Sequence, residues 1–106
     1  MSPFGQDYLM RMVEQLTAVI ARMLGLRKSG RATQALAEAE HGYDLLGLPS
    51  GLIDVVSAPA LAELLGSPEK IRLVADLLEE EAASLDALGD PRAALKRTLA
   101  AELRGL

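Results

Sequence analysis

Apolar residues recur at three- and four-residue spacing through most of the chain, which is the pattern of amphipathic helices. The first such segment predicts a helix from about residue 6 or 7 to Leu26, and Asp7 is placed to cap it or to complement its dipole. At about 100° per residue, its apolar positions cover roughly 200°, twice what one core face requires. We therefore expect this helix to pack on two sides. Its apolar residues are Tyr8, Leu9, Met10, Met12, Val13, Leu16, Val19, Ile20, Met23, Leu24 and Leu26.

The next segment predicts a second helix, from about Ala32 to Leu46, after a turn at Gly30. Glycine at the end of a helix supplies the left-handed conformation that stops it. Gly42 lies inside this second helix, where glycine costs about 1 kcal/mol relative to alanine. A close crossing by a neighbouring helix would account for a glycine there. The apolar face of the helix holds Ala32, Ala35, Leu36, Ala39, Tyr43 and Leu46.

The middle of the chain predicts short helices joined by loops. Residues 47–51 carry the glycine and proline signals of a loop, and Ser50 is placed to cap a short helix that ends near Val56. Ser57 is placed to cap a second one over residues 58–65. We expect this segment to dock on the other helices, because it is too apolar for a free linker.

Two further helices are predicted at the C-terminal end. The tripeptide Ser67-Pro68-Glu69 offers a cap, a proline at the first position and an acid in the first turn, and Gly89 ends that helix. The dipeptide Asp90-Pro91 predicts the start of the last helix by the same logic. The apolar side of the earlier helix holds Ile71, Val74, Ala75, Leu78, Ala82, Leu85 and Leu88, and that of the last helix holds Ala94, Leu95, Thr98, Leu99 and Leu103.

These segments predict an all-α fold of antiparallel helical hairpins, with about four main helices and one or two short ones. We expect a single domain over residues 1–106. A hairpin over residues 6–47 is followed by a short helical connector over residues 48–66 and by a second hairpin over residues 67–104. Stretches of alternating apolar and polar residues, which would indicate strands, are absent.

The two hairpin turns are similar, because Gly30 and Gly89 are each followed five residues later by Ala-Leu. A recurring helix–turn–helix is typical of repeat architectures, and this one resembles the tetratricopeptide repeat. The match is better over Glu69–Arg104 than over Val19–Gly47, where Met23 replaces a customary small residue. The resemblance implies hairpins that serve as a scaffold or adaptor for other proteins. The residues that carry it are Leu78, Ala82, Leu85, Gly89, Ala94 and Ala101.

The opening stretch Asp7–Leu16 resembles the start of a family of short bacterial proteins with no assigned function. That resemblance implies a bacterial protein that works inside the cell and is built from tetratricopeptide-like hairpins. It implies no activity.

Composition excludes several classes of function. The chain has 106 residues, enough for one domain, and a formal charge of -4. Its basic residues are scattered and only Phe4, Tyr8 and Tyr43 are aromatic, so we expect no binding to nucleic acid. Cysteine is absent, which fits a reducing compartment. Because no apolar run approaches the ~20 residues of a membrane span, we expect a cytoplasmic protein without a membrane partner.

No residue pattern predicts an active site or a metal site. His41 is the only histidine, and Glu38 lies three residues before it, as in carboxylate-bridged di-iron bundles. Such a site needs a second glutamate–histidine pair, which this chain lacks. The acidic run over residues 79–81 spreads around its helix because its members are consecutive. We expect no catalysis, no cofactor and no bound metal.

The mean hydropathy of +0.19 is high for a small monomeric domain and indicates an apolar surface that meets a partner. The expected function is a non-enzymatic protein–protein interaction module that self-associates as a homodimer. The alternative is a helical protein that holds a small apolar ligand between its helices. The residues expected at the interface are Tyr8, Met10, Met12, Val13, Val19 and Leu24.

Overall fold

The computed structural model describes residues 3–106, with side chains from residue 7 onward. Its secondary structure is entirely helical, which confirms the predicted all-α class for this part of the chain. In chain order the elements are α1 (Pro3–Lys28), α2 (Ala32–Leu45), the short 3-10 helix η1 (Leu52–Asp54), α3 (Ala58–Leu65), α4 (Pro68–Ala87) and α5 (Ala93–Arg104).

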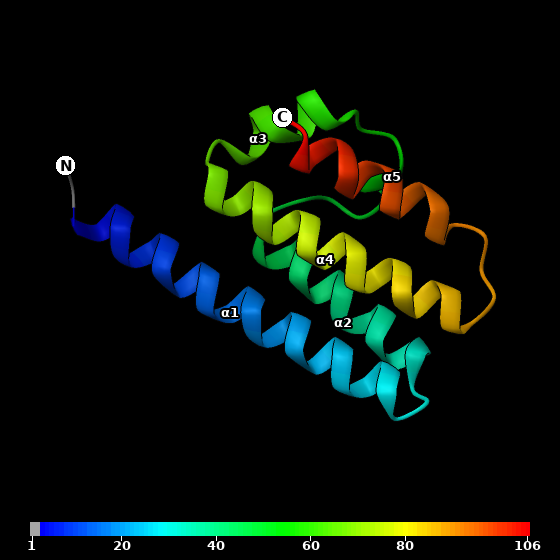
Figure 1. Cartoon of the computed structure of the whole chain (residues 1–106). Helices are drawn as coiled ribbons and strands as arrows, with labels where there is room; N and C mark the ends of the chain where they lie inside the picture. Colours follow the sequence, from blue (N-terminus) through cyan, green and yellow to red (C-terminus); the bar gives the residue numbers. More distant parts are fainter. Residues whose placement is uncertain (1–2) are drawn as a thin grey trace.

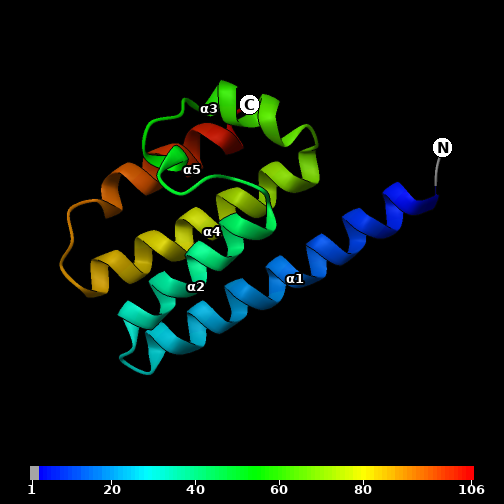
Figure 2. The same ribbon diagram turned by 180° about the vertical axis from the view of Figure 1, so that it is seen from behind.

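Helix α4 is the centre of the fold, since it contacts α1, α2, α3 and α5. Helices α1 and α2 form one antiparallel hairpin, α4 and α5 form a second one, and α3 lies across the ends of α4 and α5 (Figure 1). The first turns of α1 extend past the other helices, as both views show (Figures 1 and 2). This extension contributes to the longest dimension of the molecule, 46 Å.

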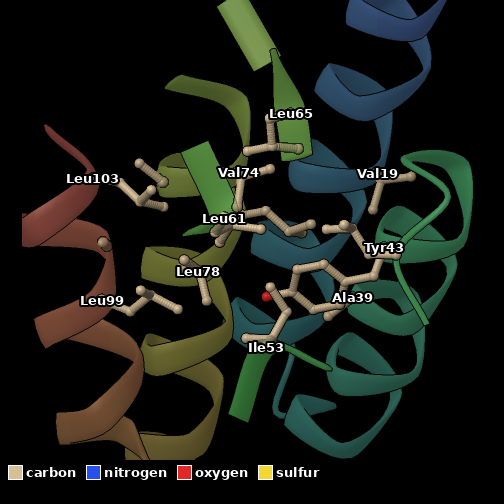
Figure 3. Packing of buried hydrophobic residues seen from close by; sticks show 14 of the residues in the cluster. Val19, Ala39, Tyr43, Ile53, Leu61, Leu65, Val74, Leu78, Leu99 and Leu103 are labelled. Carbon is tan, nitrogen blue, oxygen red and sulfur yellow. The ribbon is translucent and has the colours of Figure 1, made fainter. Parts of the chain in front are cut away.

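The buried core lies between the two hairpins and is closed by the connector (Figure 3). Val19 of α1, Tyr43 of α2 and Leu78 of α4 belong to the same buried cluster. The connector docks on it through Ile53 and Leu61, as its apolar content predicts. Gly42 also lies here, against the side chains of Val19 and of α4, so the predicted close crossing at this glycine is confirmed.

Most predicted helix ends agree with the structure. The Ser57 hydroxyl accepts a hydrogen bond from the Ala60 N–H at 3.3 Å, and the Ser67 hydroxyl accepts one from the Lys70 N–H at 3.2 Å. Both serines therefore cap the helices that follow them. Gly30 and Gly89 adopt the positive φ angles of 77° and 70° that end α1 and α4.

Two predicted helix starts are wrong. Ser50 caps no helix, because Gly51, with φ at 83°, intervenes before the single 3-10 turn of η1. The last helix begins at Ala93 rather than at the dipeptide Asp90-Pro91. At this dipeptide the Asp90 carboxylate accepts a hydrogen bond from the Arg92 N–H at 2.9 Å. The hydrogen bond closes a turn between the two residues, and the helix begins only after it.

The predicted apolar side of α5 is also wrong in part. Leu99 and Leu103 are buried as expected, but Leu95 is 72% exposed, and Ala94 and Thr98 face solvent. The buried face is rotated toward Ala93, Lys96 and Ala100. The physical reason is that Lys96 pairs with the buried carboxylate of Glu81 on α4 and with the exposed carboxylate of Asp54 on η1.

Candidate functional site

Helix α1 carries two parallel apolar stripes. The inner stripe is the set Leu9, Met12, Leu16, Val19, Met23 and Leu26, spaced alternately by three and four residues. Such spacing keeps side chains on one face of a helix. Its central members, from Met12 to Met23, are at most 5% exposed, because they pack inside the chain. The inner stripe therefore joins α1 to the rest of the fold.

The outer stripe is the set Met10, Val13, Thr17, Ile20 and Leu24, with the same alternating spacing. It lies beside the inner stripe on the flank of α1 nearer α4, because Arg27 on that flank donates a 2.8 Å hydrogen bond to Glu80 of α4. Met10 is 61% exposed, Thr17 is exposed, and the other three are half-buried. The helices of this chain leave the outer stripe partly uncovered, so a second apolar face remains on α1.

The structure separates the six residues predicted at an interface. Met10, Val13 and Leu24 belong to the outer stripe and reach the surface. Met12 and Val19 are buried in the inner stripe, so in this conformation they pack inside the chain and do not reach the surface. Tyr8 is exposed, but two positions from Met10 place it about 200° away around the helix. The predicted surface therefore reduces to three of its six residues.

A line of exposed residues borders the outer stripe, and the spacing of the apolar residues does not point to it. Asp7, Glu14, Ala21 and Lys28 are spaced by seven residues, so they lie along one edge of α1. All four are exposed. The ion pairs among the described residues do not involve Asp7, Glu14 or Lys28. The seven-residue spacing is the signal that reveals this edge.

A buried polar cluster joins four elements at the other side of the core, and the spacing of the apolar residues does not point to it either. The Tyr43 hydroxyl of α2 donates a 2.6 Å hydrogen bond to Glu81 of α4, and its oxygen points away from α2 in Figure 3. The Lys96 ammonium of α5 lies 3.7 Å from the same carboxylate and donates to Asp54 of η1 at 2.7 Å. Glu81 and Lys96 are 7% and 8% exposed.

Burial sets the protonation behaviour of this cluster. Removal from water raises the pKa of Glu81, while the hydrogen bond from Tyr43 and the charge of Lys96 oppose the rise. Burial and the nearby Glu81 carboxylate raise the pKa of Tyr43 well above its ordinary value, so this phenol remains a donor. Each polar group is satisfied by a neighbour within the chain, and the described side chains leave no buried polar atom without a partner. The cluster therefore fastens η1 and α5 to the first hairpin.

A hollow of about 640 Å³ lies between α3, α4 and the end of α5 and opens to the surface. Ile71, Ala75 and Leu103 supply apolar side chains to its wall, and Arg72 lies at it. The other arginine of this wall, Arg104, is engaged by Asp76 and Glu79 of α4. This hollow has the volume and the apolar wall to hold a small ligand.

The residues considered for metal binding do not form a site in the described chain. Within residues 3–106, no group of three histidine or acidic side chains converges on one point. Glu38 instead accepts a 3.1 Å hydrogen bond from Arg22 of α1.

None of the helices within residues 3–106 combines the length and the hydropathy that a membrane-spanning helix needs.

Comparison of the chain with models of protein families, with curated proteins and with solved structures gives no match.

Proposed function

We propose that this chain is a non-enzymatic interaction module that binds protein through the outer stripe of α1. The observation that carries the proposal is the second apolar stripe, which runs beside the buried one and is left partly uncovered by the chain's own helices. A helix that serves one core needs only one such stripe. Half-buried aliphatic side chains beside an exposed Met10 suit helix-to-helix recognition, in which removal of apolar surface from water supplies the affinity.

Photo-cross-linking from the outer stripe tests this proposal. The full chain is expressed in its own cells with a benzophenone amino acid in place of Thr17. The masses of the cross-linked adducts are then measured by electrophoresis and mass spectrometry. We expect protein adducts from position 17, and their loss when Met10→Glu or Leu24→Glu is added. A charge in an apolar interface loses its hydration without gaining a partner, so binding should weaken by about tenfold or more.

Ala18 provides the matched control, because it is exposed and one position from Thr17 points it away from the outer stripe. The benzophenone at position 18 should give no adduct that Met10→Glu removes, and Ala18→Glu should leave the adducts of position 17 intact. Circular dichroism should report unchanged helicity for all variants. Adducts from position 17 whose yield is unchanged by Met10→Glu and by Leu24→Glu would overturn the proposal.

A second candidate function is the binding of a small apolar ligand in the hollow beside α3, and the volume and apolar wall of that hollow favour it. Native mass spectrometry of the purified chain should then show an added mass. Replacing Ile71 with tryptophan would place a bulky ring in the hollow at its apolar wall and should remove that mass. Ligand retained by the Ile71→Trp variant would contradict this second candidate.

A further inference from the structure

We infer that the protein bound by the outer stripe is a second copy of this chain, with the two α1 helices packed antiparallel. This inference rests on the proposed function of the outer stripe and names its partner. It follows from the distribution of charge along the edge formed by Asp7, Glu14, Ala21 and Lys28. Because the sign reverses between the two ends of the edge, the edge is complementary to itself only when one copy is turned end over end.

The apolar layers define the pairing. With the stripes antiparallel, Val13 packs against Leu24 of the second copy, and Thr17 packs against Ile20 of the second copy. The two-fold symmetry repeats each contact. At the ends, the exposed Met10 covers the aliphatic stem of Arg27 in the second copy. The paired segments run over residues 10–27, about 27 Å at 1.5 Å per residue.

The same pairing matches the charged edges. Asp7 of each copy comes opposite Lys28 of the other, which gives two attractive pairs at the two ends of the interface. Glu14 comes opposite Ala21, a residue without charge. All of these side chains are exposed, and the ion pairs among the described residues leave Asp7 and Lys28 out. The edge therefore meets its copy with opposite charges and without a like-charge contact.

Other arrangements of the same stripe fit less well. Sliding the copies by one heptad toward the N-terminal ends brings Glu14 opposite Glu14 of the second copy. Sliding them the other way keeps an attractive pair, Glu14 with Lys28, but it leaves Asp7 without a partner, shortens the paired segment and removes Met10 and Val13 from it. A parallel pair in register brings Asp7 level with Asp7 and Lys28 level with Lys28, so like charges gather at each end. The charges thus select the antiparallel direction, and the length of the apolar contact together with the charges selects the register.

A charge-reversal cycle on the purified full chain tests this inference. The dissociation constant of the dimer is measured by light scattering and sedimentation for the wild type, Asp7→Lys, Lys28→Asp and the double variant. We expect each single variant to dimerise about tenfold more weakly, because two attractive pairs become repulsive. The double variant restores opposite charges and should regain most of the affinity. High salt should reduce the differences, since the pairs are exposed.

Mixing the two single variants gives the sharpest result. Asp7→Lys has lysine at both ends of the edge and Lys28→Asp has aspartate at both ends. The antiparallel pairing therefore predicts that they associate with each other more tightly than either does with itself. Failure of the mixture and of the double variant to recover affinity would overturn the antiparallel pairing.

The failure of this inference can be told apart from the failure of the proposed function. A wild type that stays monomeric at all concentrations, with Met10-dependent adducts to a different protein, overturns the second-copy partner and supports the outer stripe as a binding face. A dimer that withstands Met10→Glu and Leu24→Glu, with no stripe-dependent adducts, overturns both.

Discussion

Gly42 lies where α1, α2 and α4 are in close contact. A Cβ atom at this position would lie 3.0 Å from the Leu77 Cδ2 atom and 3.3 Å from the Val19 Cγ1 atom. Both neighbours are fully buried, so their side chains cannot shift without disturbing the packed core around them. The glycine therefore permits the contact between α1, α2 and α4 at the expense of helix propensity.

Replacing glycine by alanine at two helical positions tests this view. Gly25 lies in α1 with no atom near its Cβ direction, so Gly25→Ala should stabilise the protein by up to about 1 kcal/mol. Gly42→Ala gains the same propensity but must displace Leu77, and we expect it to be neutral or destabilising by about 1 kcal/mol. Urea unfolding measures both. Equal stabilisation by the two variants would contradict the tight crossing.

At the scale of the element, three helix ends share one geometry. At Gly30, Gly47 and Gly89 the glycine N–H donates three residues back, and the next N–H donates five residues back, to Leu26, Tyr43 and Leu85. These are the hydrogen bonds with which glycine ends helices. Gly47 has them although the Gly-to-Ala-Leu pattern is absent after it. The glycine that the two hairpin turns share thus follows from helix termination, while the Ala-Leu that follows each of them is a separate feature.

The orientation of α5 leads to a prediction about two leucines four residues apart. Leu99 is 9% exposed and belongs to the core, whereas Leu95 is 72% exposed. Leu99→Ala should lower the free energy of unfolding by about 2–5 kcal/mol. Leu95→Ala should change it by less than about 0.5 kcal/mol. Urea unfolding of the two variants checks the rotation of the helix, and equal losses would show that both leucines pack inside.

At the scale of the whole molecule, the polar cluster ties distant parts of the chain together. Tyr43 and Glu81 are 38 residues apart, and Lys96 and Asp54 are 42 residues apart. Each pair joins elements of different parts of the sequence across the core. Removing one member of such a cluster leaves a buried group unpaired, which costs more than the hydrogen bond itself contributes.

The raised pKa of Glu81 makes stability depend on pH in a definite direction. The folded state holds the Glu81 proton more tightly than the unfolded state does. The contribution of Glu81 to the free energy of unfolding is therefore full below the ordinary pKa of 4.5, and it is lost as the pH rises through the pKa of the folded state. The free energy of unfolding of the wild type minus that of Glu81→Gln should therefore fall as the pH is raised from 4 to 7.

Glu79 supplies a matched control of opposite sign. The hydrogen bond that Arg104 donates to Glu79 lowers the pKa of this carboxyl. The contribution of Glu79 to the free energy of unfolding is therefore present above its ordinary pKa of 4.5, and it is lost as the pH falls through the pKa of the folded state. The wild type minus Glu79→Gln difference should rise over the same pH range. Chemical unfolding at several pH values measures both slopes. Slopes of the same sign would contradict the burial of Glu81.

Local spacing in the sequence predicts the helices, most of their ends and the excess apolar arc of α1. Those features depend on neighbours a few residues apart, such as Ser67 and the Lys70 N–H that it caps, and local spacing records them directly. The surplus arc was also visible, because an arc of roughly 200° exceeds one core face.

The packing of the helices determines which part of that arc the chain covers, and local spacing does not predict it. This packing buries Met12 and Val19, leaves Met10 exposed and turns Leu95 to solvent. The fold also buries Lys96. The spacing of apolar residues within α5 gives no sign of the carboxylates on α4 and η1 that pair with this lysine. Burial of a charge depends on partners brought from elsewhere in the chain, and hydrophobic spacing within one helix carries no information about them.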